Sequence, residues 1–150
     1  MQRQNAYAII RGSRDYPRIH GIVRFRQTNR GVLVSAEIRG LPSERGKCAE
    51  DIFGFHIHEG RKCERTQNDM FGEAMAHYNP DNCAHPSHSG DLPPLFGNKG
   101  YAMMSVLTDR FTVGEIIGRV VIIHDRPDDF TTQPSGNSGE KIACGVIVGR

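Results

Sequence analysis

The chain has 150 residues, of which 37% are hydrophobic and 24% charged, and its formal net charge at pH 7 is +2. This length is enough for one domain with its own core, and the composition excludes a mostly disordered chain. No stretch reaches the roughly 18–20 consecutive apolar residues of a membrane-spanning helix, so we expect no membrane partner. The N-terminal residues lack the apolar segment of a secretory signal, which favours a cytoplasmic location and leaves a trimmed secreted form as the alternative.

The charge is unevenly distributed along the chain. Residues 1–50 contain ten Lys or Arg against four acidic residues, whereas the remainder contains nine against thirteen. The basic residues are scattered singly and lack the clusters and stacking aromatic motifs of nucleic-acid-binding proteins, so we expect no nucleic-acid partner. A solvated basic face that attracts small anions is the simpler interpretation.

Short segments with alternating apolar residues predict strands. In 31–39, GVLVSAEIR, the apolar residues share one face and the polar residues the other, as in a half-buried strand. Six further strands are predicted at 6–10, 22–27, 54–58, 101–107, 119–124 and 143–148. Gly-rich turns separate several of them, which indicates an all-β sandwich or barrel.

Two polar stretches, 59–98 and 125–141, do not resemble strands. Loops this long in a compact domain are usually functional. We find no internal repeat and no linker, so residues 1–150 are expected to form a single domain.

Six of the seven histidines fall within or beside these two stretches. His56 and His58 are two residues apart on a predicted strand, so their imidazoles share one face, although two surface histidines would show the same spacing. A second group, His77, His85, His88 and Asp91, lies within 15 residues. Three imidazoles and one carboxylate are a typical tetrahedral zinc set.

His124 follows an apolar run and on its own would be an ordinary histidine at a strand end. Together these residues provide six imidazoles and one carboxylate, and zinc takes four ligands. Seven ligands suit two metals that share one, because an imidazole has two nitrogens. Copper favours an all-imidazole site, and zinc accepts the set with the carboxylate.

Four cysteines, Cys48, Cys63, Cys83 and Cys144, allow three complete pairings, and none forms a C-x-x-C motif. A bond between Cys63 and Cys144 would tie the long loop to a strand. Four reduced thiols are the alternative in a cytosolic chain.

Four motifs occur in order along the chain: GFHIHEG, HYN-P-x4-H-x2-H-S-G-D-L, IGRVVIIHDRPDD and GNSGEKIACGVI. Together they resemble the copper/zinc superoxide dismutase family, over nearly the whole chain from about Gln4. The resemblance implies an eight-stranded Greek-key β-barrel with two long functional loops. It also implies copper and zinc as cofactors and superoxide as the substrate, disproportionated to O₂ and H₂O₂ by Cu(II)/Cu(I) cycling.

The resemblance also implies roles for individual residues. His56, His58, His77 and His124 would bind copper, and His77, His85, His88 and Asp91 would bind zinc. His77 would thus bridge the metals, and in the family mechanism it releases copper and takes a proton in the reduced state. Asp128 would hydrogen-bond one ligand of each metal, and Cys63 and Cys144 would form a disulfide.

The sequence departs from the family pattern at several places. Lys141 occupies the position at which the family has an arginine beside the copper channel. We therefore expect Lys141 to act in catalysis and the enzyme to be less active than one with the arginine. A solvated lysine without a role is the alternative. The spacing from His85 to His88 is short, which predicts a tight zinc turn. The 125–141 loop lacks the run of charges that many members have. Cys48 and Cys83 are additional; we expect a second disulfide, with Cys83 as a thiolate ligand the alternative.

Other functions fit the pattern less well. A copper- and zinc-binding family member with weak or no turnover, serving as a metal carrier or buffer, is the main alternative. A zinc hydrolase would need a general base, for which Glu59 is the nearest candidate. The resemblance allows a homodimer and a copper-delivery partner. No role is predicted for His20, and Asp129 and Asn137 are expected to order the late loop.

Overall fold

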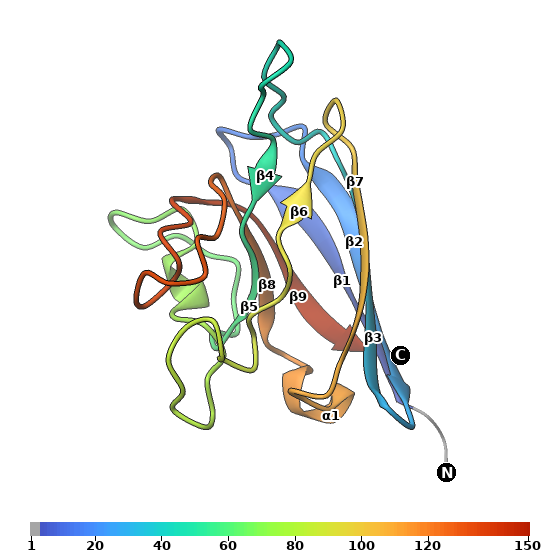
Figure 1. Cartoon of the computed structure of the whole chain (residues 1–150). Coiled ribbons are helices and arrows are strands. Elements are labelled where there is room, and N and C mark those ends of the chain that lie inside the picture. Colours follow the sequence, from blue (N-terminus) through green and yellow to red (C-terminus); the bar gives the residue numbers. More distant parts are fainter. Residues whose placement is uncertain (1–3) are drawn as a thin grey trace.

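Antiparallel strands dominate the computed structural model, which describes residues 4–150 (Figure 1). The only helical elements of this range are a 3-10 turn, η1 (Gly72–Ala74), and a short helix, α1 (Val113–Ile116). Neither has the length or apolarity required to span a bilayer. The strands are β1 (Asn5–Gly12), β2 (His20–Thr28), β3 (Gly31–Arg39), β4 (Ile52–Phe53), β5 (Phe55–His58), β6 (Leu95–Phe96), β7 (Ala102–Thr108), β8 (Val120–His124) and β9 (Lys141–Gly149).

Seven strands form one curled sheet in the order β5-β8-β9-β1-β2-β3-β7. The other two, β4 and β6, pair with each other and connect directly to its edge strands: Gly54 alone separates β4 from β5, and a turn joins β6 to β7. Figure 1 shows this pair between the two edges of the curled sheet. Counted with β4 and β5 as one interrupted strand, the eight strands match the predicted β-barrel.

The alternation in the sequence predicts the strands correctly. In β3 the side chains of Val32, Val34, Ala36 and Ile38 are fully buried, as the pattern of 31–39 predicts. All seven predicted strands are present, and their ends differ from the prediction by at most two residues. Two additional strands, β4 and β6, have two residues each, which are too few to show a period, and β6 lies inside the polar stretch 59–98.

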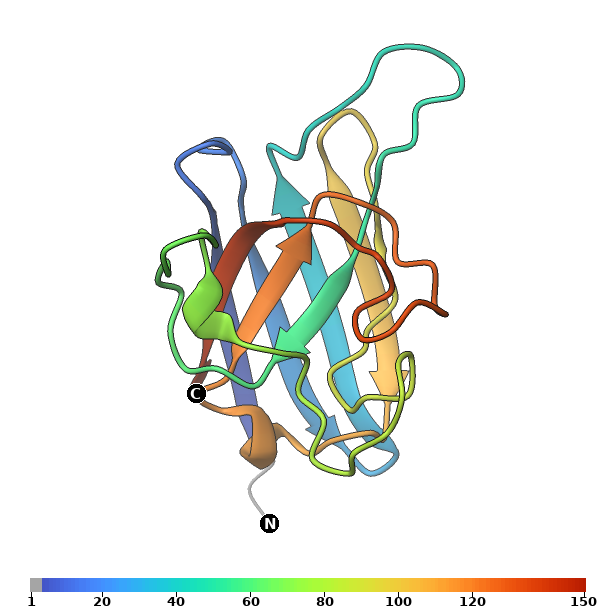
Figure 2. The ribbon, with the colours of Figure 1, turned by 90° about the vertical axis from the view of Figure 1, so that its left-hand side faces the viewer.

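In the wall formed by β5, β8 and β9, the strands β5 and β8 and residues 142–145 of β9 are buried on both faces. Phe55 and Ile57 of β5 belong to the main core, and they alternate with His56 and His58, which are also buried. On the same outer side, Ile122 and Cys144 belong to a second apolar cluster. Figure 2 shows the long loops crossing in front of these three strands. The two polar stretches therefore cover the outer face of this wall.

The predicted disulfide between Cys63 and Cys144 is present and ties the start of the first long loop to β9. The predicted disulfide between Cys48 and Cys83 is wrong. Both residues are exposed free cysteines, because the loops that carry them lie at opposite ends of the molecule in Figure 1.

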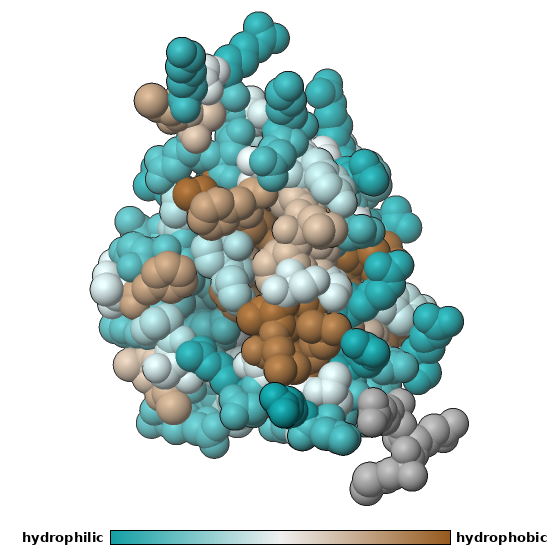
Figure 3. All heavy atoms as spheres, turned by 45° about the vertical axis from the view of Figure 1, so that its right-hand side comes forward, coloured by the Kyte–Doolittle hydropathy of each residue, from teal (hydrophilic) through white to brown (hydrophobic). Residues whose placement is uncertain are grey.

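One side of the molecule carries an exposed apolar patch. Phe96 of β6 and Met103 and Leu107 of β7 are each about half exposed or more. Figure 3 shows apolar side chains gathered on this side within a hydrophilic surround.

Candidate metal centre

Strands β5 and β8 place three histidines on the outer face of the wall. His56 and His58 alternate along β5 with the core residues Phe55 and Ile57, and β5 pairs with β8, which ends at His124. The His124 ring centroid lies 4.9 Å from that of His56 and 5.4 Å from that of His58. Three imidazoles are thereby fixed on rigid elements.

The first long loop brings the remaining ligands by running along the free edge of β5. Ile57 donates its amide to Gly90 O (2.8 Å), and Tyr78 donates its amide to Ile57 O (2.8 Å). These bonds place His77 opposite His58 and Asp91 opposite His56. A Cβ at Gly90 would lie 2.2 Å from Ile57 O, so this approach requires glycine.

The structure brings all seven predicted ligands into two adjoining clusters, and within each the candidate ligand atoms lie within 4.8 Å of one another. One, the four-histidine cluster, consists of His56, His58, His77 and His124. The other, the aspartate cluster, consists of His77, His85, His88 and Asp91. His77 belongs to both, as predicted. The short turn from His85 to His88 is compatible with this arrangement, since the two ring centroids are 5.5 Å apart.

The nitrogen positions fit metal ions. Two buried imidazole nitrogens, His56 Nδ1 and His77 Nε2, have no hydrogen-bond partner. His85 Nδ1 lies 3.0 Å from Asp91 Oδ2, inside the aspartate cluster. Like atoms also face each other: His58 Nε2 lies 3.3 Å from His124 Nε2, and His77 Nδ1 lies 3.2 Å from His88 Nδ1. Two nitrogens bound tetrahedrally to one zinc ion are about 3.3 Å apart, given Zn–N distances of about 2.0–2.1 Å. Unsatisfied buried nitrogens at this spacing are ligands arranged around a cation.

The two nitrogens of His77 face different clusters. Its Nδ1 lies 2.8 Å from Asp91 Oδ1 and 3.2 Å from His88 Nδ1, within the aspartate cluster. Its Nε2 is buried without a partner, and its ring lies against that of His56, with centroids 4.0 Å apart. One imidazole can therefore serve both sites.

Burial keeps three members of the four-histidine cluster neutral, namely His56, His58 and His124. It lowers the pKa of His56 to about 4. Burial, with repulsion from the neighbouring imidazoles, holds the pKa values of His58 and His124 well below their usual range. In the aspartate cluster, burial raises the pKa of Asp91, but hydrogen bonding and charge attraction from His77 lower it overall. Neutral imidazoles beside a carboxylate are the protonation states that bind metal ions.

Asp128 connects the two clusters by contacting one histidine of each, as predicted. Its carboxylate oxygens each lie 2.7 Å from an imidazole Nε2, one of His56 and one of His85. Burial raises the pKa of Asp128, but these two hydrogen bonds lower it far more. Because a carboxylate only accepts, both rings donate from Nε2 and turn Nδ1 toward the metal sites. Gly136 packs against Asp128 with φ +73°, and a Cβ at this position would lie 2.0 Å from Asp128 Oδ1. This position therefore requires glycine.

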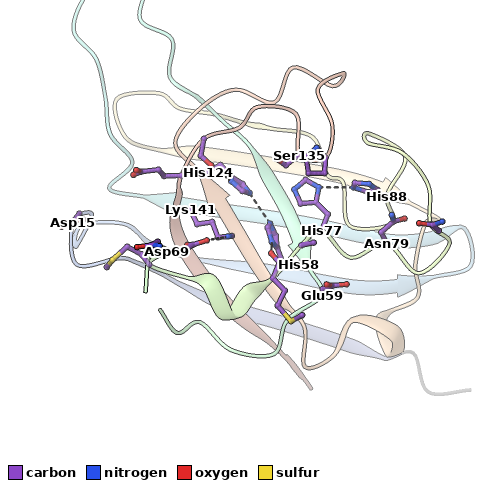
Figure 4. Close-up of a pocket in the computed structure, with 18 residues that line it drawn as sticks. Asp15, His58, Glu59, Asp69, His77, Asn79, His88, His124, Ser135 and Lys141 are labelled. Carbon is purple, nitrogen blue, oxygen red and sulfur yellow. Dashed lines mark hydrogen bonds and ion pairs between the residues drawn. The ribbon is translucent and has the colours of Figure 1, made fainter. Parts of the chain in front are cut away.

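A cavity of about 710 Å³ opens over the four-histidine cluster, and His58, His77 and His124 line it together with Lys141 (Figure 4). A bulge in β9 places Lys141 there: Ile123 pairs with Ala143, but His124 pairs with Lys141, so Ile142 is passed over. Lys141 Nζ makes an ion pair with Asp69 Oδ2, drawn in Figure 4.

Sequence reasoning missed two contacts of the site. Met75 O accepts a hydrogen bond from His58 Nδ1 at 2.8 Å, which leaves His58 Nε2 for the metal. Asp69 binds Lys141. Both residues lie in the polar stretch after Cys63, where neither spacing nor residue type distinguishes them. The alternative of Cys83 as a ligand is wrong, because neither cluster contains it.

Three other residues named in the sequence analysis have defined local conformations or contacts. The Glu59 backbone carbonyl accepts a bond from Arg119 at 2.7 Å. Asp129 accepts the amides of Thr131 and Thr132 and so orders the late loop, as predicted. Asn137 occupies a left-handed position there, with φ 53°.

A curled antiparallel barrel with two buried cation sites sharing one imidazole defines a β-barrel metalloprotein with a histidine-bridged dinuclear centre. Residues 19–147 match the copper/zinc superoxide dismutase family. The chain belongs to this family, as its motifs indicated.

Similar proteins occur in several organisms. Superoxide dismutase [Cu-Zn] 2 of Aquifex aeolicus is 36% identical over 136 residues, which cover 81% of this chain and 74% of that protein. Superoxide dismutase [Cu-Zn] of Legionella pneumophila is 35% identical, covering 85% and 76%. Superoxide dismutase [Cu-Zn] 5 of Dictyostelium discoideum is 32% identical, covering 96% and 97%.

Proposed function

We propose that the chain is a superoxide dismutase that converts two superoxide anions and two protons to O₂ and H₂O₂. The observation that carries this proposal is the position of His77, whose ring belongs to both clusters and whose buried Nε2 lacks a partner. Copper in the four-histidine cluster would supply one-electron redox chemistry, and zinc in the aspartate cluster would supply a fixed positive charge.

The residues of the chain carry the proton and position the substrate. His77 Nδ1 is fixed in the aspartate cluster, so Nε2 is the atom at which this ring can take and return a proton. The strands hold His56, His58 and His124 as neutral ligands in a site closed on its core side. Lys141 lies at the wall of the cavity as its single Lys or Arg, the position from which a positive charge would act on the anionic substrate.

The direct test is pulse radiolysis of the protein loaded with copper and zinc, with the metal-free protein as the control. We expect superoxide to decay far faster than spontaneously in the loaded sample alone. His77→Gln, which replaces the imidazole and its two ring nitrogens by a single amide group, should reduce this rate by about 100-fold or more. Stoichiometric copper and zinc binding with decay at the spontaneous rate would instead identify a metal carrier or buffer.

The resemblance also supports a homodimer and a copper-delivery partner. The exposed apolar patch formed by Phe96, Met103 and Leu107 is the surface that we propose for the dimer. Analytical ultracentrifugation of the wild type and Met103→Glu tests this, since the substitution should shift the population toward monomer. A wild-type monomer at all concentrations would contradict it.

A further inference from the structure

The cavity over the four-histidine cluster is unusually acidic for a site that takes an anion. Four carboxylate residues line it, Asp15, Glu59, Asp69 and Glu140, and Lys141 is its single Lys or Arg. Fields in a cleft are focused by its low-dielectric walls, so each of these charges affects how a small anion approaches. Whether the charge of Lys141 is free or paired therefore affects anion binding more here than it would in a channel with several basic residues.

Lys141 does not present a free charge to this cavity. Its Nζ contacts Asp69 Oδ2, and its side chain is 17% exposed, against 35% for Asp69. Figure 4 shows the pair on one side of the cavity, away from His77 and His88. An ammonium group in contact with a carboxylate has little net charge left to attract an anion.

The contact is built into the loop. Asp69 Oδ1 accepts the amide of Phe71 at 2.9 Å, and the Asp69 carbonyl accepts the amide of Thr66 at 2.9 Å. The same loop is joined to β9 by the disulfide from Cys63 to Cys144, three residues from Lys141. Both partners of the ion pair are therefore attached to one covalently linked unit, which favours the contact by limiting their separation.

We propose that Asp69 is a positioning residue that holds Lys141 and cancels its charge, so that it limits the affinity of the cavity for small anions. The inference rests on the proposed function for its effect on superoxide, but its effect on anion binding does not depend on turnover. Releasing Lys141 from Asp69 should give tighter anion binding and a faster reaction.

Asp69→Asn tests this with little disturbance to the loop. The amide oxygen of asparagine can still accept the Phe71 amide, whereas its NH₂ group cannot accept a hydrogen bond from Lys141. We expect the dissociation constant of azide, followed by visible absorption of the copper- and zinc-loaded protein, to fall about two- to fivefold at low salt. The superoxide rate constant should rise by a similar factor, and both effects should shrink at high ionic strength.

Two further variants separate this pairing from general electrostatics. Asp15→Asn removes an equal charge from the same cavity without touching Lys141, so we expect a clearly smaller change. In a Lys141→Met background the ion pair is already absent. Asp69→Asn should then change azide binding by no more than Asp15→Asn does, which completes the double-mutant cycle.

Unchanged or weaker azide binding in Asp69→Asn would overturn the proposal, as would an equal effect of Asp15→Asn. If the loaded wild type proves inactive, the proposed function fails. The azide measurements still decide whether Asp69 restrains Lys141.

Discussion

At the scale of single residues, the proton positions on the histidines determine the site. A ligand histidine presents one nitrogen to a metal only if its other nitrogen is held elsewhere. Asp128 fixes His56 and His85, and Met75 O fixes His58. These contacts leave the nitrogens facing the clusters without protons and ready to bind.

Asp128→Asn should weaken both metal sites at once. Asparagine offers one accepting oxygen and one donating NH₂ group, so one of His56 and His85 loses its partner and its preferred tautomer. We expect metal affinity to fall by about 10- to 100-fold, measured by competition with a chelator. Asp129→Asn is the matched control, because Asp129 only orders the adjacent turn. Equal losses in both variants would show that the loop matters and the carboxylate of Asp128 does not.

Lys141→Arg should increase the superoxide rate constant, by about two- to fivefold. Guanidinium has several donors in a planar fork, so it can contact Asp69 and still offer donors to an anion, whereas a single ammonium is a point charge. Pulse radiolysis at low salt measures the change. A rate equal to or below that of the wild type would mean that lysine serves at this position as well as arginine does.

At the scale of elements, the site depends on one strand edge and one bulge. The free edge of β5 pairs with the loop segments around His77 and Gly90, which both closes the edge and assembles the clusters. The bulge in β9 then turns Lys141, in place of Ile142, toward the cavity. The edge of β5 places the loop ligands only through its pairing with the loop, and the bulge of β9 places Lys141 only through its pairing with β8.

The disulfide between Cys63 and Cys144 should stabilise the fold by about 2–4 kcal/mol, because it closes a loop of 81 residues that includes the zinc ligands. The double variant Cys63→Ser/Cys144→Ser should lower the free energy of unfolding by this amount in urea titrations. Cys83→Ser, at an exposed free cysteine, should change it by less than about 0.5 kcal/mol. A double variant as stable as the wild type would show that packing alone holds the loop.

At the scale of the whole molecule, folding buries six histidines at the floor of the cavity and behind it. His56, His58 and His124 have lowered pKa values in the folded protein, whereas they return to about 6.5 on unfolding. Between these values the unfolded chain binds more protons than the folded one. Stability of the metal-free protein therefore falls as the pH is lowered.

The metal-free protein should lose stability between about pH 6.5 and pH 4, which is the range set by His56. His56 alone contributes on the order of 2 kcal/mol between pH 7.5 and pH 5. Urea midpoints at these two pH values measure the loss. A midpoint that does not vary with pH would contradict the burial of neutral imidazoles.

The sequence alone determined seven of the nine strands, the seven metal ligands and the family. Alternation in 31–39 specifies a buried face because side chains on a strand repeat every two residues. The same local rule pairs His56 with His58, and the spacing of His77, His85, His88 and Asp91 indicates zinc. These features are visible because each depends on residues close together in the chain.

The tertiary structure decided what depends on contacts between distant segments. Alternation counted back from Cys144 would direct Ile142 outward, and only pairing with β8 shows that the bulge substitutes Lys141. The contact of Asp69 with Lys141 joins residues 72 positions apart, and the separation of Cys48 from Cys83 follows from the ends of the barrel that their loops occupy. No local period encodes such contacts, because they arise when the loops fold back across the wall of β5, β8 and β9.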